Sequence, residues 1–312
     1  MPGEIPYSSG PWKFLAPGWQ PAVWCRPTLM TYLIIHVIFM ALFSLCYKMA
    51  EKKQASRPPV VLFGMAVAAT VLSLAGVAAS EGFVGDGRLI ATGIAGGVFL
   101  IVAMHTFFMA MAQGGLAIGW TLVSLAVVIP LVASIWIWNE IPGPWQVAGL
   151  VLMVPCILLF GDLHLSIAGR PARWIFLVTL ASVATGLCQL TNKIAAILPV
   201  ALGHGGTGNA VFNYMAWTFG VGGLVALAGC RDVFRNPPRK SEAGIGLLMG
   251  ALNVIGTWAF LKALEHMPGI VFFPMKAIFG VLLTALLAVA NCKEPLTRRQ
   301  RIGIQVGSCA PI

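Results

Sequence analysis

Residues 60–79, VVLFGMAVAATVLSLAGVAA, decide the fold class, because this stretch contains no charged side chain. A helix of about 20 apolar residues rises about 1.5 Å per residue and spans the roughly 30 Å hydrocarbon core of a bilayer. Similar runs recur along the 312 residues, of which 58% are hydrophobic and 10% are charged. This composition excludes a water-soluble globular domain. Because the runs are continuously apolar rather than alternating, they predict membrane-spanning helices and not the strands of a β-barrel.

The same criterion predicts about ten spanning segments, so the expected fold is an all-α polytopic membrane protein. The segments are Leu29–Tyr47, Val60–Ala79, Leu89–Met111, Leu116–Trp138, Trp145–Phe160, Trp174–Gln189, Ala210–Ala228, Gly244–Ala263, Ile270–Ala290 and a short or truncated tenth from Ile302. Residues 1–28 are polar and no small-residue cleavage site follows the first segment, which is therefore expected to be a retained helix. The seven cysteines are scattered without a C-x-x-C pair, and we expect most of them to pack as small apolar side chains.

The net charge of +10 comes from basic residues that are concentrated in alternate loops. The four basic groups are Lys48, Lys52, Lys53 and Arg57; Arg170 and Arg173; Arg231, Arg235, Arg239 and Lys240; and Lys293, Arg298, Arg299 and Arg301. The positive-inside rule places these loops in the cytoplasm and both termini outside, in a cell inner membrane. Topology thus accounts for the positive charge, and we expect no binding of nucleic acid.

The two halves of the chain match each other at a fixed offset. The matched pairs are Gly115 with Gly269, Glu140 with Glu294, Gln146 with Gln300, and Gly149 with Gly303. Just upstream, residues 107–111 resemble residues 260–264 with a slip of one position. Because each half holds five predicted segments, an odd number, the second copy is expected to insert upside down. The expected domains are the polar segment 1–28 and two inverted five-helix repeats, residues 29–161 and 172–312.

Two blocks of sequence resemble the EamA-type repeat of the drug/metabolite transporter superfamily. They are Gly114–Trp138 with Asn139, Glu140 and Gln146–Leu150, and Ala263–Gly269 with Lys293–Thr297, Gln300, Ile302 and Gly303. The resemblance covers most of both halves and implies ten helices around a central cavity. It also implies transport of sugars, nucleotide sugars, phosphorylated metabolites, amino acids or drugs. The basic residues after the first segment depart from the common bacterial pattern and look more like the sugar-uptake branch, such as the rhamnose and glucose permeases.

Lys276 is the main candidate for a solute-binding charge, because it lies about two turns inside the ninth segment. A charge at membrane depth costs at least a few kcal/mol, so it requires a partner, a hydrated cavity or a function. The alternative is that its aliphatic stem carries the ammonium to the nearer interface. All ten acidic residues fall in loops or at segment ends. Their positions argue against a cationic drug and favour a neutral or anionic solute.

Other polar and aromatic side chains could complete a substrate-binding site. Asn253 and Thr257 are one turn apart and share a helix face, which suits either solute contact or hydrogen bonding between helices. The further candidates are Trp258, Asn213, Tyr214, Gln189 and His105. His36 and His105 lie inside segments and could relay protons, although a hydrogen bond to a neighbouring helix is the simpler explanation for each. Glu140 and Glu294 are expected to be structural residues at repeat-related turns.

These features predict a secondary transporter that moves a small neutral or anionic metabolite by alternating access. Its expected partners are the solute and the lipid bilayer, and no cofactor or metal is implied. No catalytic motif such as G-x-S-x-G or H-E-x-x-H is present, so an enzyme is not expected. The alternatives are a sugar/proton symporter, a drug or amino-acid exporter, and, from a different class, a lipid-handling protein, a membrane enzyme or a non-transporting scaffold.

Overall fold

A computed structural model describes residues 27–52, 57–80, 82–111, 123, 125–144, 147, 151, 171–201, 207–230 and 237–292. Every regular element within these ranges is helical, which confirms the all-α prediction for this part of the chain. Five of the helices are long and apolar enough to cross a membrane, judged by length and composition. The predicted segments Trp145–Phe160 and Ile302 onward lie almost wholly outside the described residues. The protein is therefore a helical, membrane-embedded protein, with five spans supported directly.

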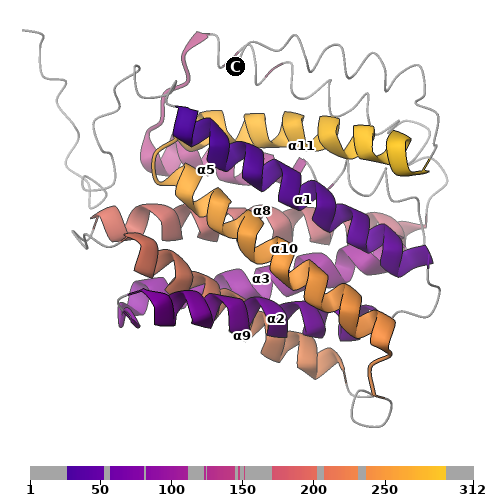
Figure 1. Ribbon diagram of the computed structural model, residues 1–312. Helices are drawn as coiled ribbons and strands as arrows, with labels where there is room; N and C mark the ends of the chain where they lie inside the picture. Colours follow the sequence, from indigo (N-terminus) through magenta and orange to yellow (C-terminus); the bar gives the residue numbers. More distant parts are fainter. Residues whose placement is uncertain are drawn as a thin grey trace, which may run out of the picture.

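The helices follow the predicted apolar runs closely (Figure 1). They are α1 (Pro27–Lys52), α2 (Pro58–Ala79), α3 (Gly87–Met111), the 3-10 turn η3 (Leu125–Val127), α5 (Val128–Trp138), α8 (Ala172–Ala201), α9 (Thr207–Gly229), α10 (Lys240–Leu264) and α11 (Gly269–Cys292). The predicted end of the sixth segment at Gln189 is wrong, because α8 continues to Ala201. Asn192 and Lys193, which suggested a helix end, instead bond to other helices inside the protein.

Helices of the first half pack mainly against helices of the second half. Helix α2 lies against α9 and α10, α3 against α8 and α9, α1 against α10 and α11, and α5 against α8 and α11. The exchange of α1, α2, α3 and α5 for α8, α9, α10 and α11, in that order, leaves this set of contacting pairs unchanged. The packing thus has the pattern of a two-fold exchange between the halves.

Helices α2 and α9, which this exchange relates to each other, run in opposite directions. At the end of α2, the Ser80 hydroxyl donates to Asn209 Oδ1 at the start of α9, over 3.2 Å. At the other end, Gly229 of α9 lies close to Pro59 of α2, where an added methyl group would be 3.8 Å from Pro59 Cβ. The two helices are therefore antiparallel over their full length.

Helices α3 and α9 approach each other closely at two glycines spaced one turn apart. A methyl group at Gly93 would lie 3.2 Å from the Tyr214 carbonyl oxygen, and one at Gly97 would collide with the Thr218 carbonyl oxygen. Small residues four positions apart allow helix backbones to approach closely in membranes. Since later residues of α3 meet later residues of α9, the two helices run parallel.

An equivalent glycine pair joins α10 to α2. A methyl group at Gly246 would lie 2.9 Å from the Val61 carbonyl oxygen, and one at Gly250 would lie 2.6 Å from the Met65 carbonyl oxygen. Gly246 and Gly250 follow Gly93 and Gly97 at a fixed offset in the sequence. The same offset separates residues 107–111 from residues 260–264. Helices α10 and α2 also run parallel, so α3 and α10 are antiparallel to each other.

The segments that precede α2 and α10 meet at one end of the helices. The Arg57 backbone N–H donates to Glu242 Oε1 over 2.9 Å, and its guanidinium forms an ion pair with Glu242 Oε2 at 3.0 Å. Glu242 also accepts a bond of 2.9 Å from the Arg239 backbone N–H at the start of α10. Arg57 and Arg239, from two of the loops predicted to be cytoplasmic, are therefore neighbours.

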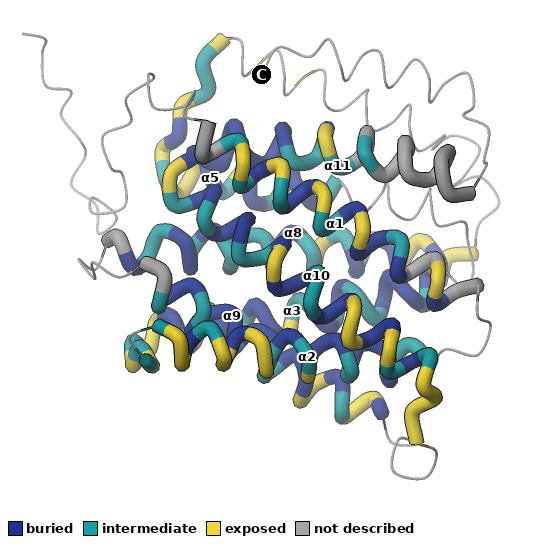
Figure 2. Tube along the Cα trace, in the orientation of Figure 1, coloured by how far each residue is buried: buried dark blue, intermediate teal, exposed yellow. Residues whose placement is uncertain are grey.

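The outward faces of several helices expose large apolar side chains (Figure 2). On α2, the exposed residues include Val71 at 59% and Leu72 at 43%, and Leu224 on α9 reaches 68%. A soluble monomer rarely exposes contiguous apolar surface of this kind. Lipid tails are the natural environment of such faces.

Candidate functional site

A cavity of about 230 Å³ lies between α1, α3, η3, α8, α10 and α11, so that both halves of the chain contribute to it. Its volume is somewhat below the roughly 300–1,000 Å³ of pockets that take drug-sized ligands. The cavity therefore suits a small metabolite.

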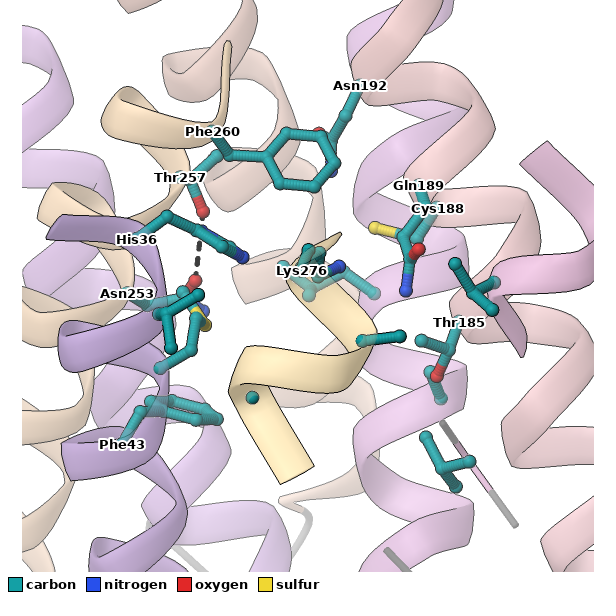
Figure 3. Close-up of a pocket in the computed structure, with 18 of the residues that line it drawn as sticks. His36, Phe43, Thr185, Cys188, Gln189, Asn192, Asn253, Thr257, Phe260 and Lys276 are labelled. Atoms are coloured by element: carbon teal, nitrogen blue, oxygen red, sulfur yellow. Dashed lines mark hydrogen bonds between the residues drawn. The ribbon is translucent and has the colours of Figure 1, made fainter. Parts of the chain in front are cut away.

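The polar groups of this cavity lie mainly on helices of the second half (Figure 3). They are Thr185, Cys188, Gln189, Asn192, Asn253, Thr257 and Lys276, with His36 from the first half. The first half supplies an apolar wall that includes Met40, Phe43, Leu100, Met104 and Phe107. No carboxylate is present among the described lining residues.

Lys276 of α11 lines the cavity, and its role in binding a solute stays a prediction. Its Nζ lies 4.7 Å from the centre of the Phe260 ring, which fits a cation–π contact. Phe272, one turn earlier on α11, packs edge-to-face on Phe260 with ring centres 4.9 Å apart and holds that ring in place. Within the described part of the chain, no acidic side chain lies within ion-pair distance of Lys276. Its charge is therefore available to an anionic group in the cavity.

His36, on α1, also lines the cavity and is only 3% exposed. Its Nδ1 is 2.8 Å from the Gly256 carbonyl oxygen of α10. Because a carbonyl oxygen only accepts hydrogen bonds, Nδ1 carries the hydrogen, and in the neutral imidazole Nε2 is then an acceptor. His36 Nε2 is buried and has no hydrogen-bond partner among the described residues.

The amide side chains of the cavity differ in whether their oxygen atoms already accept a hydrogen bond from the protein. Thr257 Oγ1 donates to Asn253 Oδ1 over 3.0 Å, so these two residues both bond to each other and line the cavity. Asn192 Oδ1 accepts a 2.8 Å bond from the Tyr214 hydroxyl of α9, and this bond orients the Asn192 amide. Gln189 Oε1, in contrast, is buried without a partner in the described structure.

Four of the candidate residues do not line the cavity. Trp258 packs edge-to-face on Tyr32 with ring centres 5.5 Å apart, and His105 is a half-buried residue of α3. Asn213 is fully buried and binds the segment before α3, through the Gly82 carbonyl oxygen and the Val84 backbone N–H. The fourth, Tyr214, lies outside the lining and donates a hydrogen bond to Asn192, which is part of the lining.

A second buried polar cluster contains Lys193, which directly follows the lining residue Asn192 on α8. Lys193 is 1% exposed, and its Nζ lies 2.6 Å from both Glu140 Oε1 and Ser134 Oγ. The same ammonium is 4.3 Å from the centre of the Trp138 ring. Glu140 Oε2 accepts a 3.0 Å bond from the Ile270 backbone N–H in the first turn of α11. The cluster ties α5 of the first half to α8 and α11 of the second half.

Sequence reasoning placed Glu140 at a structural turn but did not identify Lys193 as its partner. Glu140 and Lys193 carry opposite charges and both lie next to apolar sequence. A charge in such surroundings requires a partner, so the sequence did contain a signal that the two could pair. Gly269 is part of the same arrangement, since a methyl group there would collide with the Ser134 hydroxyl and lie 2.7 Å from Lys193 Nζ. The predicted counterpart Glu294 lies outside the described residues.

Comparison with known proteins bears on the fold alone. No protein-family model and no curated protein matches the sequence. Among solved structures 27 chains match, and one of them, titled only as the crystal structure of a protein, has a TM-score of 0.69 at 13% identity. The alignment covers 92% of this chain and 96% of the other. Fold and site together define a helical membrane protein with a partly polar cavity between its two halves.

Proposed function

We propose that the protein is a secondary transporter of a small neutral or anionic metabolite, and that it works by alternating access. The cavity carries this proposal, because it lies among membrane-spanning helices and presents one ammonium, from Lys276, without a carboxylate among the described lining residues. An ammonium in such a place attracts an anion or donates hydrogen bonds to hydroxyl groups. It repels a cationic drug.

The packing of the helices supports two inverted repeats, as the resemblance to the EamA-type repeat implies. Exchange of the halves preserves the helix pairs, and the related helices α2 and α9 are antiparallel. Many secondary transporters bind their substrate between two inverted repeats and alternate access by moving one repeat against the other. The cavity occupies the equivalent position here, with walls from both halves.

Two rival functions make different demands on the interior of the protein. A non-transporting scaffold would be expected to pack the space around Lys276 tightly, and the cavity weighs against it. A lipid-handling protein would need an apolar site that opens sideways, whereas this cavity includes amides, two hydroxyls, an imidazole and an ammonium. The lining is mainly apolar, but these polar groups favour a solute that carries hydrogen-bonding groups over a lipid tail.

Flux measurements in proteoliposomes test the proposal. The purified protein would be assayed with sugars, phosphorylated sugars, carboxylates and amino acids, alongside Lys276→Met and the matched control Lys240→Met. Lys240 is an exposed lysine at the start of α10, far from the cavity lining. We expect Lys276→Met to abolish flux while the control and the amount of folded protein stay unchanged. Flux of hydrophobic cations alone, or full flux by Lys276→Met, would overturn the proposal.

A further inference from the structure

We infer that the solute is a hydroxycarboxylate, whose carboxylate pairs with Lys276 and whose neighbouring hydroxyl donates to His36 Nε2. This inference rests on the proposed function and names the substrate class of the same site. It follows from a count of the hydrogen-bonding groups that the cavity leaves unpaired.

The inference rests on one cation, Lys276, and on two buried acceptors without a partner among the described residues. His36 Nε2 is an acceptor because Nδ1 is committed to the Gly256 carbonyl oxygen, and Gln189 Oε1 is the other buried oxygen without a described partner. Figure 3 shows the His36 ring directed towards Lys276, with Gln189 on the far side of the ammonium. Both acceptors are closed off from water-sized contact, so a solute reaches them only by displacing neighbouring side chains. A buried acceptor without a partner costs about 1–3 kcal/mol, and a solute that supplies a donor removes this cost.

The donor that fits is neutral. An amino group next to the carboxylate would be an ammonium, and it would bring a second positive charge beside Lys276. The described cavity lining offers no carboxylate to compensate that charge. A hydroxyl supplies the same hydrogen bond without the charge, and the geometry therefore points to a hydroxy acid rather than an amino acid.

The rest of the solute should be apolar. Met40, Leu100, Met104 and Phe107 form the wall that the first half contributes. A branched aliphatic or small aromatic group next to the hydroxyl would be buried against this wall, and apolar burial contributes about 25 cal/mol per Å². A fully hydroxylated sugar would leave its polar groups unpaired there.

Binding of three carboxylates that share one carbon skeleton tests the inference. The probes are 4-methylpentanoate, its 2-hydroxy derivative and its 2-amino derivative leucine, measured by calorimetry on the full chain in detergent. We expect the hydroxy acid to bind about tenfold more tightly than the other two, which corresponds to one satisfied hydrogen bond. The amide of the hydroxy acid should bind about 10–100-fold more weakly than the acid, because it lacks the charge that Lys276 binds.

Two substitutions of His36 separate recognition from folding. His36→Asn places an amide donor where Nδ1 now bonds to Gly256 but removes Nε2, so the protein should fold and lose the preference for the hydroxy acid. His36→Gln places a polar atom near Nε2 and should retain part of that preference. His105→Phe removes the imidazole on α3 that lies outside the cavity, and it should leave the preference unchanged. Thermal unfolding of each variant without ligand checks that the fold is intact.

Each outcome decides one question. Equal binding of the three acids, tightest binding of leucine, no binding of any probe, or an unchanged preference in folded His36→Asn each overturns the inference. Selective binding without flux in proteoliposomes would instead refute the proposed transport function and leave the assigned ligand class standing. Flux of another solute without binding of hydroxy acids would do the reverse.

Discussion

The buried pair of Glu140 and Lys193 gives the sharpest test of how the two halves are held together. Lys193→Met replaces the ammonium by an apolar group of similar length and leaves the Glu140 carboxylate buried without its cation. Breaking a buried ion pair from one side costs about 3–5 kcal/mol. Glu140 keeps the bond from the Ile270 backbone N–H, which favours the lower end of this range. We therefore expect a loss of about 3 kcal/mol.

The reverse variant and the double variant complete a thermodynamic cycle. Glu140→Gln keeps the shape of the side chain and leaves the Lys193 ammonium uncompensated, so it should cost about 3–5 kcal/mol on its own. The double variant removes both charges, and replacing a whole buried pair is often nearly neutral. The two single losses should therefore not add, and the coupling between them should exceed about 2 kcal/mol.

Reversible unfolding in mixed micelles, followed by tryptophan fluorescence and circular dichroism, measures these free energies. Lys240→Met serves as the control, because this exposed lysine should change stability by less than about 0.5 kcal/mol. A loss of less than 1 kcal/mol for Lys193→Met, or simple addition of the single losses, would refute the reasoning that the pair is buried and mutually compensated.

Two further predictions use the same unfolding assay. Gly250→Ala should destabilise the protein by about 1–3 kcal/mol, because the methyl group meets the backbone of α2. Gly244→Ala on the same helix faces open space and should instead stabilise by about 0.5–1 kcal/mol; equal effects at both positions would contradict the close packing. Glu242→Gln should cost about 1 kcal/mol and lose part of that effect at high salt, because Arg57 is 33% exposed. A salt-independent loss would argue that backbone capping dominates over the ion pair.

The apolar runs predicted most helices to within a few residues, because about 20 uncharged residues allow little other than a spanning helix. The end of α8 could not be predicted in this way. Asn192 and Lys193 look like terminal residues until their partners Tyr214 and Glu140 are known, and Glu140 belongs to the other half of the chain. A hydrogen bond between residues far apart in the chain cannot be recognised from the local sequence around either residue.

The residues that line the cavity could be predicted only in part, because four of the nine candidates lie elsewhere. Lys276 was singled out because a charge within an apolar helix requires an explanation, and Asn253 and Thr257 because one turn separates them. The sequence could not tell that Trp258, on the same helix, faces Tyr32 rather than the cavity. The two unpaired acceptors became visible only once their neighbours were placed.

The interleaved packing of the halves has a consequence for synthesis of the protein. Helix α3 ends at Met111, whereas its partner α9 begins only at Thr207. At about 5–20 residues per second, a ribosome takes about 5–20 s to make the intervening chain. During that interval the glycine-lined face of α3 has only lipid or an insertion factor to cover it. The N-terminal half should therefore be short-lived when expressed alone, yet it should recover when the C-terminal half is supplied as a separate polypeptide.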